Sequence, residues 1–123
     1  MFELLHGAAT DGLHEVELRL HGGSTVTVVL ASEGYPSSPK KGRLLGGLAE
    51  LAASTSYGAA WVNYAGVSKD ESGNFIASGG RVLSCTALGK DLKSTQKMAY
   101  ELLANIDLEG GHFRTDIAHR AIR

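Results

Sequence analysis

The sequence predicts an α+β domain with a small, barrel-like and mainly antiparallel β-sheet and one long amphipathic helix near the C-terminus. The first observation is a series of short apolar runs, such as TVTVVL at residues 25–30, whose β-branched side chains favour strands. The second is the run 92–105, in which apolar side chains recur at helical spacing. The third is the content of 16 glycines against 2 prolines, which is typical of tight turns between short elements.

Length and charge restrict the possible functions. A chain of 123 residues, 43% of them hydrophobic and 20% charged, has the size and composition of one globular domain. With 12 basic against 13 acidic residues the formal net charge is -1, so we expect no nucleic-acid partner. The apolar stretches are short and interrupted, so we expect no membrane partner. The start of the chain lacks the pattern of a secretion signal, which predicts a cytoplasmic location.

The N-terminal part is predicted to contain a helix and a β-hairpin. Residues 1–12 carry apolar side chains on one side and end in a glycine, a pattern typical of a short helix. Apolar and polar residues alternate over 14–20, which predicts a half-buried strand. The glycine-rich turn at 21–24 is expected to join this strand to a more buried one at 25–30.

The middle of the chain is less regular. Residues 31–42 (ASEGYPSSPKKG) form a polar loop that carries both prolines. Residues 43–53 are mostly Leu, Gly and Ala and fit a short strand or a helix equally well. Residues 58–66 predict a strand, with Trp61 and Val62 as its contributions to the core.

The last part combines two strands with the strongest helix. A turn cluster at 68–74 separates the preceding strand from short extended segments at 75–77 and 81–88. Asp91 is a good N-cap for the helix over 92–105, because its carboxylate can accept a hydrogen bond from a free backbone N–H of the first turn. The side chains expected to be buried between this helix and the sheet are Leu92, Leu102 and Leu103.

No complete catalytic constellation is visible in the sequence. The histidines are scattered and lack metal-ligand spacing, so we expect no metal site. Cys85 is the single cysteine and lies among apolar strand residues, which predicts a buried, unreactive thiol. The glycines of 34–42 and of 79–81 match no phosphate-binding signature, and an ordinary turn explains them more simply. Three basic residues, Lys40, Lys41 and Arg43, lie close to Glu33 and Tyr35 and make this loop a candidate ligand-facing segment.

Three segments taken together resemble the C-terminal domain of phosphoribosylamine–glycine ligase, also called glycinamide ribonucleotide synthetase. The first is VVLASEGYP at 28–36, followed by KG at 41–42. The second is GGRVL at 79–83, continuing as TALG at 86–89 and DL at 91–92. The third is FR at 113–114 with DI at 116–117 and RA at 120–121. Their order and spacing extend the resemblance over nearly the whole chain, residues 1–123.

The chain departs from the family pattern in two places. The HAGT turn of the family is YAGV here, so Tyr64 replaces an imidazole and Val67 replaces a hydroxyl. The closing tyrosine–arginine pair is Phe113-Arg114, and DIG is replaced by DIA ending at Ala118. Tyr64 and Val67 are therefore not included among the substrate-binding residues that the resemblance implies.

The resemblance implies a fold of the hybrid-motif type and a function in de novo purine biosynthesis. The family is an ATP-dependent ligase that activates glycine with MgATP and joins it to 5-phosphoribosylamine, which gives glycinamide ribonucleotide. Its N-terminal and ATP-grasp domains, which bind Mg²⁺ and ATP, lie upstream of the domain that this chain resembles. They would be the partners of this chain, which on its own is expected to be inactive.

The resemblance also implies that the loop after the strand 25–30 faces the acceptor substrate. The substrate-binding residues that we expect on this basis are Glu33, Gly34, Tyr35, Lys41 and Arg81. Arg81 is expected to be a buried arginine beside two glycines, able to pair with a carboxylate or a phosphate, or alternatively to tie this domain to the ATP-grasp body. No catalytic, cofactor-binding or metal-binding residue is expected in this chain. The competing interpretation is a free-standing, non-catalytic module that binds a small ligand or a partner.

Overall fold

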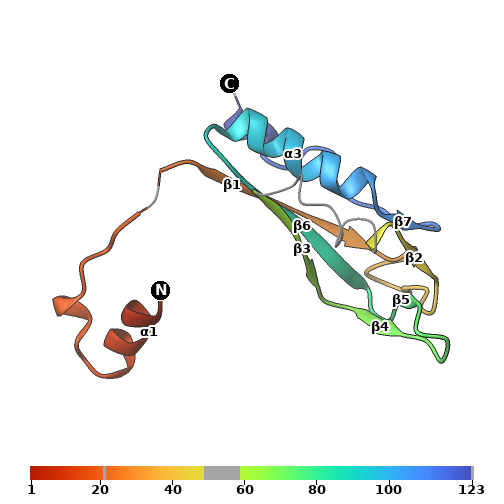
Figure 1. Ribbon diagram of the computed structural model, residues 1–123, viewed down its shortest axis with the longest axis horizontal. Coiled ribbons are helices and arrows are strands. Elements are labelled where there is room, and N and C mark those ends of the chain that lie inside the picture. The colour runs from red at the N-terminus through yellow and green to blue at the C-terminus, as the bar shows by residue number, and fades with distance from the viewer. Residues whose placement is uncertain (21, 49–58, 123) are drawn as a thin grey trace.

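The computed structural model describes residues 1–20, 22–48 and 59–122, and its α+β architecture with antiparallel sheets and a long late helix confirms the predicted fold class (Figure 1). The helical elements are α1 (Phe2–Ala9), η1 (Leu13–Glu15), α3 (Leu92–Ala104) and η3 (His119–Ala121). The strands are β1 (Ser24–Ala31), β2 (Leu45–Gly46), β3 (Ala60–Tyr64), β4 (Val67–Lys69), β5 (Phe75–Ala77), β6 (Arg81–Gly89) and β7 (Asp107–Leu108).

The main sheet has the strand order β1-β6-β3, and all of its pairings are antiparallel. Cys85 of β6 lies opposite Val28 of β1 on one side and opposite Val62 of β3 on the other. Two small sheets, β4-β5 and β2-β7, complete the strand pairings. Isolated bridges join Ala31 to His112 and Leu44 to Ile76, so the loop regions are tied to the same end of the fold.

Helix α3 covers one face of the main sheet (Figure 1). The carboxylate of Asp91 accepts a 2.9 Å hydrogen bond from the backbone N–H of Ser94, as expected for an N-cap. Leu102 and Leu103 are each only 2% exposed, whereas Leu92 is partly buried. The sheet residues that form the core with them include Val26, Val28, Leu30, Leu83, Cys85 and Ala87.

Among the described residues no helix covers the opposite face of the sheet, which we call the open face, and this corrects the predicted role of Trp61. Trp61 is 45% exposed on this face, while its neighbour Val62 packs against the core as predicted. Successive strand residues point to opposite sides, so only one of the two could be buried under α3. The hydroxyls of Thr27 and Thr86 lie 2.9 Å apart on this open face.

The predicted strand over residues 14–20 is absent, and the predicted hairpin is therefore wrong. Residues 16–20 have no strand partner, and Leu18 and Leu20 are 61% and 84% exposed. Figure 1 shows the segment running away from the sheet toward α1, which is set apart from the other elements. Alternating apolar residues indicate that one side of the segment is suited to burial, but they do not specify a strand partner. The strand that pairs with β1 is β6, not residues 14–20. We refer to residues 1–20 as the N-terminal arm.

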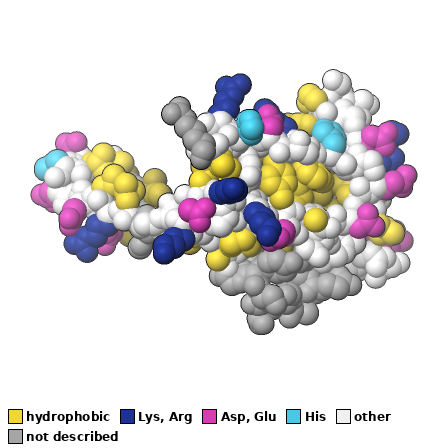
Figure 2. Space-filling view, turned by 90° about the horizontal axis from the view of Figure 1, so that it is seen from above, with side chains coloured by type: hydrophobic (Ala, Val, Ile, Leu, Met, Phe, Trp, Pro, Cys, Tyr) yellow, Lys and Arg dark blue, Asp and Glu magenta, His cyan; other side chains and the backbone are white. Residues whose placement is uncertain are grey.

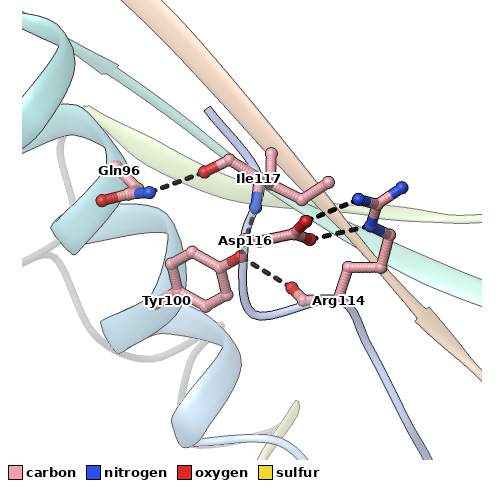
Figure 3. Close-up of polar contacts among 5 residues, drawn as sticks. All are labelled: Gln96, Tyr100, Arg114, Asp116 and Ile117. Carbon is pink, nitrogen blue, oxygen red and sulfur yellow. Dashed lines mark hydrogen bonds and ion pairs between the residues drawn. The ribbon is translucent and has the colours of Figure 1, made fainter. Parts of the chain in front are cut away.

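The C-terminal tail is held against α3 by side chains of the helix (Figure 3). The Gln96 side-chain amide donates a 2.6 Å hydrogen bond to the carbonyl oxygen of Ile117. The Tyr100 hydroxyl donates to the carbonyl oxygen of Arg114 at 2.6 Å and accepts from the N–H of Ile117 at 3.2 Å. Arg114 makes two side-chain hydrogen bonds with Asp116, at 2.8 and 2.6 Å. The third segment of the resemblance therefore fixes the tail in place.

Some sequence predictions cannot be compared with the structure in full. The run 43–53 contains β2, but its part from residue 49 onward lies outside the described residues, as does residue 58 of the predicted strand 58–66. Within the described ranges, none of the helices has the length and apolar character needed to cross a membrane.

Candidate functional site

The loop after β1 is fixed to the turn before β6 by a buried serine. Ser32 is 1% exposed, its N–H donates to the carbonyl oxygen of Gly80 at 2.8 Å, and its hydroxyl donates to that of Gly79 at 2.7 Å. Because these bonds join Ser32 to residues that are distant in sequence, they bring the loop that contains Tyr35 beside the start of β6 at Arg81. The first two segments of the resemblance therefore meet in space.

Two glycines allow this close approach. Gly34 has φ +81°, and a Cβ there would collide with the carbonyl oxygen of Ser38, so the turn requires glycine. A Cβ on Gly80 would lie 2.6 Å from Cδ2 of the Tyr35 ring, so the ring rests directly on the Gly80 backbone. The Tyr35–Pro36 peptide bond is cis. The aromatic ring is thus held against the turn that precedes Arg81.

A pocket of about 780 Å³ opens between the loop, β6 and the turn that follows β3. Its wall brings together three of the predicted site residues, Tyr35, Lys41 and Arg81. Arg81 is exposed rather than buried, which corrects the expectation of a buried arginine and leaves its guanidinium accessible from solvent. The remaining lining residues are Val29, Pro36, Pro39, Ala65, Gly66, Gly80, Leu83 and Ser84.

Glu33 and Gly34 do not line this pocket. One carboxylate oxygen of Glu33 lies 2.7 Å from Lys40 Nζ, and the other lies 2.6 Å from a terminal nitrogen of Arg43. The hydrogen bonds from Lys40 and Arg43 hold the pKa of Glu33 below its usual value of 4.5. Both oxygens are therefore already engaged, and Gly34 acts through the shape of the turn. A direct contact of either residue with substrate stays a prediction.

Arg43, which the sequence analysis named only as one of the three basic residues of the loop, has a structural role. Besides Glu33, it donates a 2.5 Å hydrogen bond to the carbonyl oxygen of Glu109 in the turn after β7. A Cβ on Gly110 would meet both Arg43 and Glu33, so glycine is required where this turn crosses them. The signal that could have identified Arg43 is its place in the basic group of the loop, but its partner Glu109 is distant in sequence.

The turn that departs from the family pattern lies at the edge of the pocket. Ala65 and Gly66 line it, and the N–H of Gly66 donates a 3.0 Å hydrogen bond to the carbonyl oxygen of Arg81. Tyr64 is 52% exposed and its ring lies 5.7 Å from that of Phe75. The altered residues therefore border the pocket, although neither Tyr64 nor Val67 lines it. Sequence reasoning missed Ala65, Gly66, Val29 and Ser84 as lining residues.

Other candidate chemistry is not supported by the described residues. Within 1–20, 22–48 and 59–122, no three His, Cys, Asp or Glu side chains gather where they could hold a metal ion. This donor set does not fit a Mg²⁺–nucleotide complex, which needs carboxylates directed at the metal. Cys85 is fully buried, and burial raises the pKa of its thiol from 9.0 to about 12. The thiol stays protonated near neutral pH and is a poor nucleophile, as predicted.

The fold and the pocket define a small α+β domain with a pocket at one end of its sheet, and Lys41 and Arg81 are among the residues that line it. Residues 25–120 match the family described as phosphoribosylglycinamide synthetase, C domain. The chain belongs to this family, as the three segments of the sequence predicted.

Known relatives agree with this membership. The chain is 44% identical over 120 residues to the phosphoribosylamine–glycine ligase of Mycobacterium tuberculosis (strain H37Rv), which covers 97% of this chain and 26% of that protein. It is 41% identical over 121 residues to the chloroplastic phosphoribosylamine–glycine ligase of Arabidopsis thaliana, which covers 98% and 22%. The crystal structure of the phosphoribosylamine–glycine ligase from Thermotoga maritima superposes with a TM-score of 0.68 at 30% identity, over 93% of this chain and 27% of that one.

The chain thus spans about a quarter of the length of the relatives that it matches. The family match begins at residue 25, so the N-terminal arm lies outside it. The relatives nevertheless align with 97–98% of the chain, and their similarity therefore extends into the arm.

Proposed function

We propose that this chain is the C-terminal domain, residues 1–123, of an ATP-dependent ligase that joins glycine to 5-phosphoribosylamine in de novo purine biosynthesis. The observation that carries the proposal is the pocket, because it unites Tyr35, Lys41 and Arg81 from the two segments that characterise the family resemblance. In this proposal the pocket forms one wall of the substrate cleft, in which the product glycinamide ribonucleotide is formed. A cytoplasmic location accompanies this function.

The contacts support a division of roles within the domain. In this proposal Tyr35, Lys41 and Arg81 bind and orient the substrate, since these three residues are among those that line the pocket. Glu33 and Gly34 support them by fixing the loop, because Glu33 is engaged by Lys40 and Arg43 and Gly34 forms the turn. The activation of glycine with MgATP belongs to the upstream N-terminal and ATP-grasp domains.

The N-terminal arm supplies the contact with those upstream domains. Figure 2 shows hydrophobic side chains gathered on the arm, which projects from the rest of the molecule. Large exposed apolar patches mark interaction surfaces, because exposing them to water is unfavourable. The arm residues concerned are Met1, Phe2, Leu5, Leu13, Leu18 and Leu20, all 49% or more exposed. The similarity of the relatives in this region fits a segment that packs against the upstream part of the same enzyme.

A chimera tests this proposal. The last quarter of the Mycobacterium tuberculosis relative is replaced by this chain, and product formation is measured from glycine, 5-phosphoribosylamine and MgATP. We expect turnover, and we expect Tyr35→Ala to reduce it more than it reduces the free energy of unfolding. Tyr35→Phe keeps the ring on Gly80 and separates the hydroxyl from packing. A chimera that folds but forms no product would favour the non-catalytic binding module instead.

The arm has its own test with the upstream part supplied as a separate polypeptide. Leu5→Glu is expected to weaken association by placing a charge in an apolar contact. Thr10→Glu adds the same charge at an exposed polar position of the arm and serves as the matched control. Equal association of both variants would contradict the assignment of the arm.

A further inference from the structure

Each strand of the main sheet contributes one large apolar side chain to the open face. Val29 of β1, Trp61 of β3 and Leu88 of β6 are 42%, 45% and 45% exposed. Trp61 lies opposite Thr86 of β6. Val29 lies opposite Ser84 of the same strand. Because Ser84, Thr86 and Leu88 are alternate residues of β6, the three apolar side chains occupy neighbouring rows on one side of the sheet.

These rows carry no charged side chain. The other residues of the open face in them are Thr25, Thr27, Asn63, Ser84 and Thr86. The outer side of α3 differs, because Lys93, Lys97 and Glu101 are exposed there and Lys97 pairs with Glu101 at 3.5 Å. Depletion of charged residues around an aromatic side chain is typical of the core of a protein interface, and tryptophan is enriched among the residues that contribute most to binding.

The polar side chains at the centre of the open face bind one another. The hydroxyl oxygens of Thr27 and Thr86 lie 2.9 Å apart, and the side-chain amide of Asn63 donates a 3.2 Å hydrogen bond to the hydroxyl of Thr86. Burying a polar group without a hydrogen bond is costly, so bonds that already exist lower the cost of covering these groups. A partner can therefore cover Trp61 and its neighbours without leaving these two hydroxyls unbonded.

The open face connects two features that the proposed function assigns to contact with the upstream domains. At one end, Leu88 lies opposite Thr25, next to the start of β1 and just after the N-terminal arm. At the other end, Val29 and Ser84 also line the pocket. A partner that holds the arm and closes the cleft over the pocket therefore passes over Trp61 between them.

The upstream part of the enzyme has the length for this contact. The matched region covers 26% of the Mycobacterium tuberculosis relative, so most of that protein lies outside it. In the proposed function the pocket is one wall of the substrate cleft, and the upstream domains supply the others. The surface that closes the cleft approaches the sheet from the side of Val29, because α3 covers the other side.

We propose that the open face is a docking surface for the upstream part of the same enzyme, with Trp61 at its centre and Val29 and Leu88 on either side. The identity of the partner rests on the proposed function. The docking surface adds a second contact to that of the N-terminal arm, and it places the upstream domains directly beside the pocket.

Trp61 is the single tryptophan of the chain, which makes the centre of this surface accessible to measurement. It is replaced by 5-fluorotryptophan, and its fluorine NMR signal is compared in H2O and D2O, because an exposed indole shows a solvent isotope shift and a buried one does not. We expect this shift in the 123-residue chain and its loss in the chimera. Trp61→Phe in the chimera identifies the Trp61 signal among those of the upstream part.

A second measurement uses the upstream part as a separate polypeptide. Leu88→Lys places a charge on the open face and should weaken association about tenfold or more, since the charge would be buried in an apolar contact. Ala104→Lys adds the same charge at an exposed position of α3, on the other side of the sheet, and should leave association unchanged. Circular dichroism checks that both variants fold.

Three results would overturn the proposal. One is an equal solvent isotope shift at Trp61 in the isolated chain and in the folded chimera. Another is equal association of Leu88→Lys and Ala104→Lys with the upstream polypeptide. The third is a shift that disappears as the concentration of the isolated chain rises, which would assign the open face to a second copy of this chain.

Failure of the proposed function gives a different result. An inactive chimera in which Trp61 is buried would refute the ligase function and retain the docking surface. An active chimera in which Trp61 stays exposed would retain the ligase function and refute the docking surface.

Discussion

The hydroxyl of Tyr100 on α3 donates a 2.6 Å hydrogen bond to the carbonyl oxygen of Arg114 in the C-terminal tail (Figure 3). The same oxygen accepts from the N–H of Ile117, so one side chain satisfies two backbone groups of the tail. The ring of Tyr100 lies 6.1 Å from that of Phe113, which adds an aromatic contact on the same side. Together these contacts place the tail along the helix.

We expect Tyr100→Phe to destabilise the domain, because it removes both hydrogen bonds and keeps the ring. Losing two such bonds costs about 1–3 kcal/mol in the free energy of unfolding. Tyr64→Phe is the matched control, since the hydroxyl of Tyr64 forms no hydrogen bond with the described residues. Urea denaturation measures both. An equal loss in the two variants would show that the Tyr100 hydroxyl does not hold the tail.

A second prediction concerns the contact between α3 and the sheet. Leu102 is 2% exposed, so Leu102→Ala should leave a cavity and cost about 2–5 kcal/mol in the free energy of unfolding. Leu88→Ala removes the same atoms from a side chain that is 45% exposed on the open face, and we expect a cost of about 1 kcal/mol or less. The denaturation midpoints of the two variants give the comparison. Similar midpoints would mean that the helix does not cover the sheet through Leu102.

How well the sequence predicted the fold depends on whether the signal was local. The helix α3 could be predicted because its N-cap Asp91 and its apolar spacing lie within one segment. The alternation over residues 14–20 was equally regular, yet no strand forms there. The alternation indicates that one side of the segment is suited to burial, but it does not indicate which part of the protein, or which other chain, covers that side. The prediction that Trp61 contributes to the core was wrong for a related reason, because the sequence does not reveal which face of a strand is covered.

Three of the residues that line the pocket, Tyr35, Lys41 and Arg81, could be named from the sequence, but the way in which they come together could not. Tyr35 and Arg81 were named from two separate segments. Hydrogen bonds from Ser32 to Gly79 and Gly80 bring these segments together, and no local sequence pattern predicts such bonds. Glu33 had the same sequence context as Tyr35 and nevertheless faces Lys40 and Arg43. Which of the neighbouring cations pair with the Glu33 carboxylate depends on their distances in the folded structure, and these cannot be read from the sequence.

The ionic contacts of Glu33 predict an acid-sensitive loop. Lys40 and Arg43 lower the pKa of Glu33, so the contribution of this group to stability is present above its usual value of 4.5 and is lost as the pH falls through the lowered value. We expect Glu33→Gln to be less stable than the unmodified chain at neutral pH, with a difference that closes in acid. Glu71→Gln, at an exposed glutamate without an ion pair among the described residues, is the matched control and should be about as stable as the unmodified chain at neutral pH. Urea denaturation across this pH range measures both.

The buried thiol predicts a stability change in alkali. Burial raises the pKa of Cys85 from 9.0 to about 12. Between these values the unfolded chain loses the thiol proton and the folded chain keeps it, so the free energy of unfolding falls as the pH rises. Cys85→Ala removes this contribution, and its free energy of unfolding should decline less steeply above pH 9.0. Parallel pH profiles for the two proteins would contradict a protonated thiol in the folded state.

The last prediction is that this chain alone neither binds MgATP tightly nor forms glycinamide ribonucleotide. A magnesium-bound triphosphate needs carboxylates aimed at the same place as the phosphates. In the part of the chain that the structure describes, the pocket offers cations and hydroxyls without an acid, and the carboxylates of Asp70 and Asp91 are occupied by their own turn and N-cap.

Calorimetry with MgATP and a product assay on the isolated chain check this prediction, with the chimera as the positive control for both. Micromolar nucleotide binding by the isolated chain, or product above the blank, would mean that its own residues perform chemistry that we assign to the upstream domains. Activity that returns only in the chimera would place the ATP-dependent step upstream and leave this domain the task of holding the substrate through Tyr35, Lys41 and Arg81.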